Sequence, residues 1–203
     1  MLIDIANHIK TPIKGIIQVG AHKGGELEYI SKLSSNILLF EPQKDIFKEL
    51  IEKLKPGMIA ENFALGAVSE KNVKMFKEKN NQSQSSSLLE PSIHLKQYPS
   101  IKFDDVEYVD IITLDEYKNT SDYNLMLIDV QGFELEVLKG AKRTLENIDY
   151  ILCEVNRAEV YKGCPDVTEI DSFLSTFGFK RVETNWAGWT WGDAFYSKLI
   201  KEI

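Results

Sequence analysis

Four short apolar runs of this sequence each end in a residue that can bind a ligand or move a proton. Gly20 ends the run "IIQVG", Glu41 ends "LLFE", Asp129 ends "LMLID" and Glu154 ends "YILCE". A glycine lets a ligand approach the backbone closely. A carboxylate can accept hydrogen bonds from ribose hydroxyls or take a proton from a reacting hydroxyl. The pattern therefore indicates a nucleoside-type ligand near the first two residues and acid–base chemistry near the last two.

The glycine turn lies in residues 16–26, "IIQVGAHKGGE", and its spacing narrows the choice of ligand. His22 stands where the dinucleotide fingerprint G-x-G-x-x-G has a glycine, and no Gly-Lys-Ser/Thr follows as in a P-loop. Free N–H groups at the start of the following helix favour a carboxylate ligand. With Glu41 some twenty residues later, the turn indicates an adenosine-type cofactor and argues against a nicotinamide oxidoreductase. A tight turn and a solvated glutamate are the alternative.

Three side chains are candidates for a catalytic base: Asp129, Glu154 and His22. Asp129 is the best placed, although it can instead cap the helix that follows it. Glu154 can act as a base, accept a hydrogen bond from the substrate or pair with Arg157, and a loop histidine such as His22 is often only solvated. Asp129 and Glu154 could also share a Mg²⁺ ion. No dense ligand motif accompanies them, so we predict no metal site.

Strands and helices must alternate to bring these residues together. Apolar runs predict strands at 15–19, 37–40, 58–65, 125–130 and 150–155, with a short extra strand at 73–76. Apolar residues at helical spacing predict helices at 26–33, 45–54, 133–145 and 168–177, and residues 180–183 and 194–197 predict a closing hairpin. This order predicts an α/β sandwich with a largely parallel sheet and right-handed crossovers. Ligands then bind beyond the carboxyl ends of the strands.

Two segments allow two interpretations each. Residues 78–92, "EKNNQSQSSSLLEPS", are polar and low in complexity. They form either a flexible surface loop or a lid over the sheet edge that becomes ordered when ligand binds. Trp186, Trp189 and Trp191 all lie in "NWAGWTWGDAFY". They form either a wall that stacks on a sugar or flat acceptor, or a hairpin packed on the sheet edge.

The composition fits one soluble domain. The chain has 203 residues, 43% of them hydrophobic, which is enough for one core; we expect a single domain over 1–203, with a lead-in at 1–14 and a variable loop or lid at 78–105. The net charge of −7 disfavours a nucleic-acid partner. No apolar stretch approaches ~18 residues, so we expect no membrane span. We see no signal peptide and expect a cytoplasmic protein, whose oligomeric state is left open.

Four blocks of the sequence, in this order, resemble the FkbM-like S-adenosylmethionine-dependent methyltransferases. They are the glycine turn, "LLFEPQKDIFKELIEKL", "TLDEY" followed by "LMLIDVQGFELEVLKGAKRTL", and "YILCEVN" with the later "GDAFYSK". The third block is the most characteristic, and the resemblance extends over about 15–198. It implies the class I methyltransferase fold, Rossmann-like, with a seven-stranded, mostly parallel sheet whose last strand, at 194–197, is antiparallel. It also implies S-adenosyl-L-methionine as the cofactor.

The resemblance assigns cofactor contacts residue by residue. It implies that the methionine part lies against Gly20, Ala21 and Gly24, the ribose against Glu41, the adenine near Asn62, Ala64 and Leu65, and the sulfonium beside Asp129 and Val130; Pro42 and Gln18 are counted with these contacts. Gln18 stands where the family often has Asp, and its side chain can still hydrogen-bond the cofactor's ammonium group. His22 stands where Asn is frequent, and Gln131 where Glu is frequent. Gln18 and Gln131 thus remove negative charge beside a positively charged cofactor.

We interpret the protein as a methyltransferase that acts on a hydroxyl of a glycan or other small molecule. The methyl donor is already activated, so the protein mainly aligns donor and acceptor. Asp129 would orient the acceptor hydroxyl and help to remove its proton. The alternative, motivated by the neutral Gln18 and Gln131, is a non-catalytic binding module that has retained the fold and a nucleoside pocket.

Overall fold

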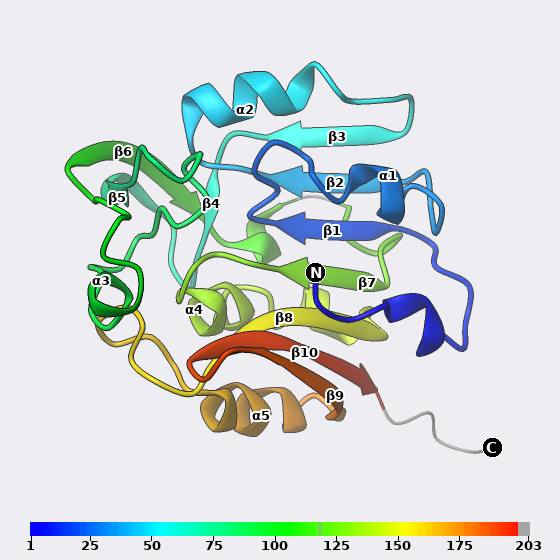
Figure 1. The fold of residues 1–203 in the computed structure, drawn as a ribbon. Coiled ribbons are helices and arrows are strands. Elements are labelled where there is room, and N and C mark those ends of the chain that lie inside the picture. The colour runs from blue at the N-terminus through cyan, green and yellow to red at the C-terminus, as the bar shows by residue number, and fades with distance from the viewer. Residues whose placement is uncertain (118, 199–203) are drawn as a thin grey trace.

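The computed structural model describes residues 1–117 and 119–198, and its centre is a seven-stranded sheet (Figure 1). The strand order is β3-β2-β1-β7-β8-β10-β9. The strands are β1 (Ile16–Val19), β2 (Ile37–Phe40), β3 (Met58–Glu61), β7 (Leu125–Ile128), β8 (Tyr150–Asn156), β9 (Phe179–Ala187) and β10 (Trp191–Lys198). The pairs among β3, β2, β1, β7 and β8 are parallel, whereas β10 is antiparallel to both β8 and β9. The predicted sheet, including its antiparallel last strand, is confirmed.

The register of the parallel strands brings their carboxyl ends to one edge. Val19 of β1 pairs with Phe40 of β2 and with Ile128 of β7. The residues that follow continue the ladder, because the Gly20 N–H donates to the Phe40 carbonyl at 3.0 Å and the Asp129 N–H to the Val19 carbonyl at 3.0 Å. The chemical residues identified in the sequence therefore meet at this edge.

Helices cover both faces of the sheet, which explains why its inner strands are continuous apolar runs. One face packs against α1 (Leu27–Ile30), α2 (Lys44–Ile51) and the N-terminal segment, which begins with a 3₁₀ turn at Ile5–Asn7. The other face packs against α4 (Glu134–Lys139) and α5 (Val167–Ser175). β1 and β7 are buried at every position.

A second, three-stranded sheet lies beyond the carboxyl edge of the first (Figure 1). Its strands are β4 (Ala64–Leu65), β5 (Glu70–Lys77) and β6 (Asp105–Ile112), in the order β4-β6-β5. The strand predicted at 58–65 is therefore wrong as one unit, since β3 and β4 belong to different sheets. The extra strand predicted at 73–76 exists as the longer β5. The short helix α3 (His94–Gln97) lies beside this sheet, within the segment expected to vary.

Two predicted helices are shorter than expected. The helix predicted at 26–33 is the single turn α1, and the one predicted at 133–145 divides into α4 and a 3₁₀ turn at Thr144–Glu146. Gly140 separates these two pieces where the chain lies against the backbone of Gly66. A Cβ on Gly140 would lie 1.9 Å from the Gly66 carbonyl oxygen, so only glycine fits there.

Candidate active site

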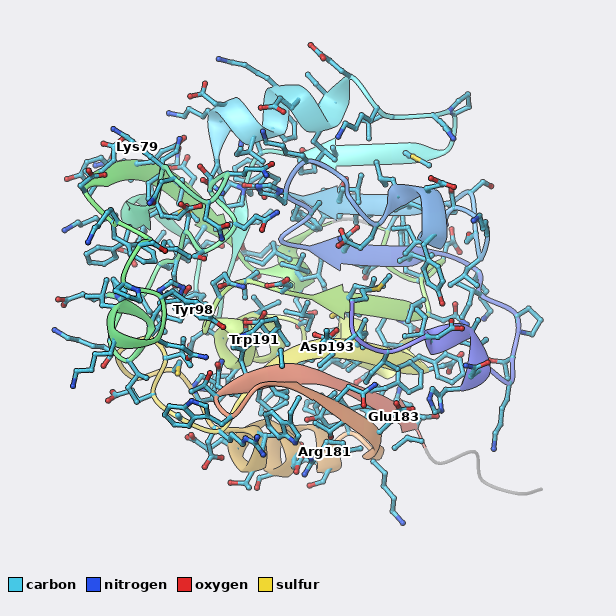
Figure 2. All side chains as sticks on the ribbon, in the orientation of Figure 1. Lys79, Tyr98, Arg181, Glu183, Trp191 and Asp193 are labelled. Carbon is cyan, nitrogen blue, oxygen red and sulfur yellow. The ribbon has the colours of Figure 1, made fainter. Side chains whose placement is uncertain are left out.

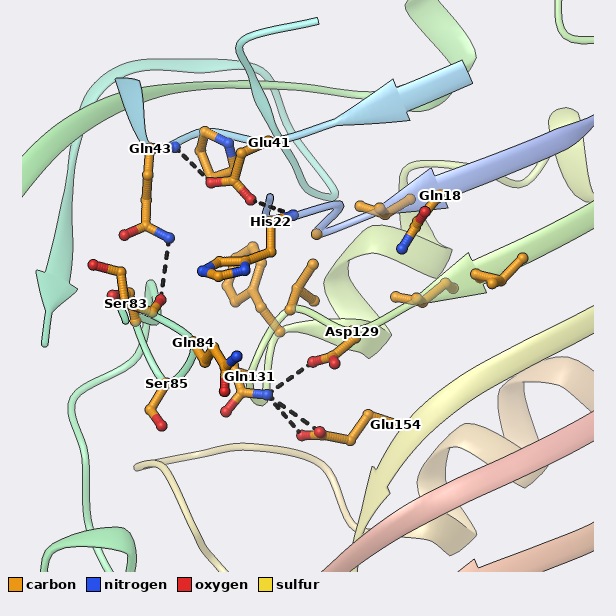
Figure 3. Close-up of a pocket in the computed structure, with 18 of the residues that line it drawn as sticks. Gln18, His22, Glu41, Gln43, Ser83, Gln84, Ser85, Asp129, Gln131 and Glu154 are labelled. Atoms are coloured by element: carbon orange, nitrogen blue, oxygen red, sulfur yellow. Dashed lines mark hydrogen bonds between the residues drawn. The ribbon is translucent and has the colours of Figure 1, made fainter. Parts of the chain in front are cut away.

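A cavity of about 560 Å³ opens at the carboxyl edge of the parallel strands (Figure 3). The ends of β1, β2, β7 and β8 form its floor, and the start of β4 forms one side. Residues from 81 to 101 cover it from the side of the small sheet. This is the position that the topology predicts for a ligand.

The glycine turn contributes only part of its residues to the cavity wall. Gly20 lines the cavity with φ of 79°, and a Cβ there would lie 1.8 Å from the Asp129 carbonyl oxygen. Ala21 is instead fully buried in the core under α1. A Cβ on Gly24 would lie 2.5 Å from a Leu27 methyl carbon, so this glycine permits helix packing. Neither Ala21 nor Gly24 lines the cavity wall, whereas Gly25 and Glu26 do, so the contacts of Ala21 and Gly24 with the cofactor stay predictions.

Glu41 points its carboxylate into the cavity from the end of β2 (Figure 3). One carboxylate oxygen accepts from the His22 N–H at 2.9 Å and the other from the Gln43 N–H at 2.8 Å. The side chain is 3% exposed, and this burial raises the pKa of Glu41 to about 7. Each oxygen keeps a second lone pair for a ligand donor.

Residues 63–65 form the side of the cavity next to Glu41. Pro42, Phe63, Ala64 and Leu65 line it with apolar surface. Asn62 does not line it, because its amide nitrogen donates to the carbonyls of Glu41 at 2.9 Å and Pro42 at 3.0 Å. Its side chain thus holds the residues that follow β2, and its place near the adenine stays a prediction.

Asp129 and Glu154 lie together and are joined by Gln131 (Figure 3). The Gln131 amide nitrogen donates to Asp129 Oδ1 at 2.8 Å and lies 3.2 and 3.3 Å from the two Glu154 oxygens. The Asp129 side chain is exposed to the cavity, and its position deep in the protein, where it is partly removed from bulk water, raises its pKa to about 6. Burial, followed by the charges of Asp129 and Glu134, raises the pKa of Glu154 well above its ordinary value. The pKa values of both carboxyl groups are therefore raised while the two groups share one hydrogen-bond donor.

Asp193 is a third acidic residue of the cavity that the sequence analysis did not single out. It lies on β10 directly opposite Glu154 of β8 and lines the cavity near Met1 and Leu2. Its carboxylate accepts a hydrogen bond from the Leu2 N–H. The signal was present in "GDAFY", where an acidic residue interrupts a buried strand.

Two structural alternatives for the candidate bases are wrong. Asp129 does not cap α4, since no side chain among the described residues bonds the first N–H groups of this helix. The buried Glu134 instead holds the loop before the helix, accepting from the N–H groups of Val130 at 3.1 Å and Gly132 at 3.0 Å. Glu154 does not pair with Arg157. The Arg157 guanidinium instead donates to two carbonyls of the β9–β10 turn and lies 4.3 Å from the centre of a Trp186 ring.

Residues 78–92 lie over the cavity, as the lid interpretation expects. His22 lines the cavity and its Nε2 lies 2.8 Å from the Gln82 carbonyl oxygen. Gln43 Nε2 donates to the Ser83 carbonyl at 3.3 Å. Ser87 is fully buried and its hydroxyl donates to the Gln131 carbonyl at 2.7 Å. The segment thus contacts both the glycine turn and the acidic pair.

The three tryptophans do not form one wall. Trp191 lines the cavity, and its indole N–H donates to the Tyr98 hydroxyl at 3.0 Å; the two side chains lie close together in Figure 2. Trp186 points to the opposite face of the hairpin, under Arg157, and Trp189 is 63% exposed. The stacking interpretation therefore holds for Trp191 alone.

Gln18 supplies the cavity with an acceptor that has no partner. Its side chain is 5% exposed, and its amide nitrogen donates to Glu26 Oε2 at 3.1 Å. The amide oxygen is buried without a hydrogen-bond partner, which is costly unless a ligand donates to it. Such an acceptor, a glycine turn and the buried Glu41 carboxylate fit a nucleoside ligand with a cationic end.

Other binding modes receive no support from the described residues. Over 1–117 and 119–198 we find no cluster of three or more His, Cys, Asp or Glu side chains arranged to hold a metal ion. Within the same ranges no helix has both the length and the apolar character needed to cross a membrane.

One protein with a similar sequence and two structures with a similar fold are described as methyltransferases. The 2-O-methyltransferase NoeI of Sinorhizobium fredii is 25% identical over 185 residues, which cover 85% of this chain and 76% of that protein. A structure described as a putative S-adenosylmethionine-dependent methyltransferase from Listeria monocytogenes has a TM-score of 0.54 at 11% identity, covering 92% of this chain and 91% of that one. The 1,6-didemethyltoxoflavin-N1-methyltransferase of Burkholderia thailandensis, solved with bound S-adenosylhomocysteine, has a TM-score of 0.51 at 10% identity, covering 96% and 74%.

The sequence model described as the methyltransferase FkbM domain matches residues 18–181, which include the glycine turn and both candidate carboxylates of the acidic pair. This match supports the interpretation as an enzyme against the alternative of a non-catalytic binding module. The chain belongs to the FkbM methyltransferase family and is an enzyme of the class I fold that uses S-adenosylmethionine.

Proposed function

We propose that this methyltransferase acts on a hydroxyl group of a glycan or other small molecule that carries no negative charge near the reacting hydroxyl. The observation that carries the proposal is the charge of the cavity. Five carboxyl side chains line it, and in the described part of the chain no Lys or Arg does so. An anionic acceptor would meet these five carboxyl groups without a lysine or arginine to offset them, whereas a neutral or amine-bearing acceptor would not be repelled. This also disfavours nucleic acid.

The cofactor would occupy the half of the cavity formed by β1, β2 and β4. Glu41 would accept the ribose hydroxyls, with the adenine beside Pro42, Ala64 and Leu65, and the sulfonium end beside Asp129 and Val130. When bound, S-adenosylmethionine supplies an activated methyl group. The remaining task of the protein is to orient the acceptor and accept its proton.

Asp129 suits the role of proton acceptor. With a pKa of about 6 it is mostly ionised at neutral pH, yet it is basic enough to take a proton during the reaction. Gln131 holds it by one hydrogen bond, which leaves further lone pairs directed to the cavity. Burial and the neighbouring carboxylates raise the pKa of Glu154 and so favour its protonated form, which would donate a hydrogen bond to the acceptor.

The acceptor would lie between the acidic pair and the segment around α3. Trp191 and Tyr98 offer a flat surface there, joined by their hydrogen bond. His94 lines the same region, is 4% exposed, and has a ring Nδ1 without a partner. Burial lowers the pKa of His94, so its ring is neutral and able to bond a hydroxyl. A flat, weakly polar wall with single hydrogen-bonding groups is typical of sugar sites.

An acceptor screen tests the proposal. The protein is incubated with S-adenosylmethionine carrying a labelled methyl group and a panel of neutral sugars, amino sugars, sugar phosphates, phenols and a short RNA. Mass spectrometry locates the label. We expect label on an oxygen of a neutral or amine-bearing acceptor. Label on nitrogen or carbon, or preference for a sugar phosphate or RNA, would contradict the proposal. The Asp129→Asn variant identifies background transfer.

A further inference from the structure

Gln18 and Glu26 form a pair at the end of the cavity that the acid–base mechanism does not use. Gln18 is on β1, on the face that packs against α1, and Glu26 directly precedes α1. Their only direct link is the hydrogen bond from the Gln18 amide nitrogen to Glu26 Oε2, 3.1 Å long. Both side chains line the cavity.

This hydrogen bond fixes which way the Gln18 amide points. A carboxylate can only accept, so the amide nitrogen must face Glu26 and the amide oxygen must face away from it. That oxygen is the buried acceptor without a partner. A ligand group that fills this place must therefore be a hydrogen-bond donor.

Glu26, like the other carboxylates of the cavity, is held by neutral groups only. Glu41 accepts from two backbone N–H groups, Asp129 and Glu154 from Gln131, and Asp193 from the N-terminal backbone. Glu26 receives one side-chain hydrogen bond from the neutral Gln18, and among the described residues no lysine, arginine or histidine forms an ion pair with it. Its negative charge is uncompensated.

We propose that Glu26 supplies the negative charge that binds the ammonium group of S-adenosylmethionine, together with the side-chain oxygen of Gln18. An ammonium group has three donors and a positive charge, and the pair offers one neutral acceptor and one charged acceptor beside each other. Gln18 carries no charge, and Glu26, eight residues later at the start of α1, thereby provides the negative charge. The inference concerns cofactor binding and does not depend on the identity of the acceptor.

Binding of two ligands to the purified full-length protein tests this role. S-adenosylhomocysteine has the ammonium group but no sulfonium charge, and 5′-methylthioadenosine has the same nucleoside and sulfur but no amino-acid end. For Glu26→Gln, which keeps the shape and removes the charge, we expect S-adenosylhomocysteine to bind roughly 10-fold more weakly, because a charge-assisted hydrogen bond is replaced by a neutral one. We expect 5′-methylthioadenosine to bind as to wild type. Calorimetric titration measures both.

Two further variants separate charge from shape. Glu28→Gln is the matched control, since it removes the same charge from an exposed side chain of α1, and it should change neither affinity. The double variant Gln18→Glu with Glu26→Gln exchanges the two side chains and should bind S-adenosylhomocysteine within about threefold of wild type. Melting curves check that each variant is folded.

The proposal is overturned if Glu26→Gln weakens both ligands equally, because Glu26 would then only shape the cavity. It is also overturned if neither affinity changes. Should Glu26→Gln alone fail to fold, the exchanged variant decides the question: near-normal affinity for S-adenosylhomocysteine supports the proposal, and a loss confined to this ligand despite a folded protein contradicts it.

Discussion

Replacing Glu41 by glutamine should reduce the pH dependence of folding. Burial raises the pKa of Glu41 from 4.5 to about 7. The folded chain therefore holds this proton more tightly than the unfolded chain, and the resulting stability is complete below about pH 4.5 and is lost as the pH rises to about 7. At 1.36 kcal/mol for each tenfold change in proton affinity, the contribution is roughly 3 kcal/mol. Glutamine does not titrate, so the variant lacks it.

The variant also loses one hydrogen bond. The carboxylate accepts from the backbone N–H groups of both His22 and Gln43, and a glutamine amide can accept with its oxygen only. This costs roughly 1–3 kcal/mol at every pH. Compared with wild type, Glu41→Gln should therefore be clearly less stable at pH 5, and the difference should shrink by up to about 3 kcal/mol at pH 8. Urea unfolding at the two pH values measures it.

The control is Glu52→Gln, because Glu52 is an exposed residue at the end of α2. The stability of this variant should keep the wild-type pH dependence. A constant difference between Glu41→Gln and wild type from pH 5 to pH 8 would refute the raised pKa.

In a parallel titration, Glu41→Gln should weaken S-adenosylhomocysteine binding by roughly 1.5–3 kcal/mol, since one acceptor of the ribose hydroxyls is lost. Wild-type affinity should fall below pH 7, where protonation of Glu41 competes with the ribose. Unchanged affinity in the folded variant would exclude the ribose role.

Three other predictions concern turnover and the lid. Asp129→Asn should lower turnover ~10²–10⁴-fold with a smaller effect on cofactor affinity, and wild-type turnover should rise with pH through about 6, where Asp129 ionises; normal turnover with an inactive Glu154→Gln would reassign the base. Hydrogen exchange at 78–92 should slow when cofactor and acceptor are both bound, and equal exchange in both states would leave only the surface-loop interpretation. Tyr98→Phe removes the hydroxyl that bonds the Trp191 indole, so it should raise the acceptor KM several-fold without changing cofactor affinity; an equal loss of both would show a general folding effect.

The sequence predicted the inner strands well because their burial leaves a simple signal. β1, β2 and β7 are buried at every position, so their residues are apolar apart from Gln18, and a glycine or an acidic residue directly follows each strand. Gly20, Glu41 and Asp129 are such residues, and their common edge followed from the parallel arrangement. The family resemblance then supplied the cofactor. The position of the site thus needed only local composition and one topological rule, whereas the identity of the cofactor needed the resemblance.

The parts that were missed depend on contacts distant in sequence. β6 gave no clear signal because Val106 and Tyr108 are exposed on its outer face. Asp193 joins the cavity only because β10 inserts between β8 and β9 and pairs with Glu154. The hydrogen bonds of the Asn62 side chain could not be predicted either, because its partners are the backbone carbonyls of residues 41 and 42.

Gln131 shows how a departure from the family pattern can be matched to its surroundings. The sequence alone suggested that a neutral residue there weakens the attraction for a positively charged cofactor. In the structure its amide nitrogen bonds both Asp129 and Glu154, and its amide oxygen lies 2.9 Å from the Tyr161 hydroxyl. A glutamate would replace the donor by a third carboxylate oxygen and raise the pKa of both neighbours through like-charge repulsion. The hydrogen bond from Gln131 acts in the opposite direction and lowers them. The neutral amide of Gln131 thus helps to keep Asp129 ionised at neutral pH. Although residue 131 carries no negative charge itself, it favours the negative charge of Asp129, the proposed proton acceptor.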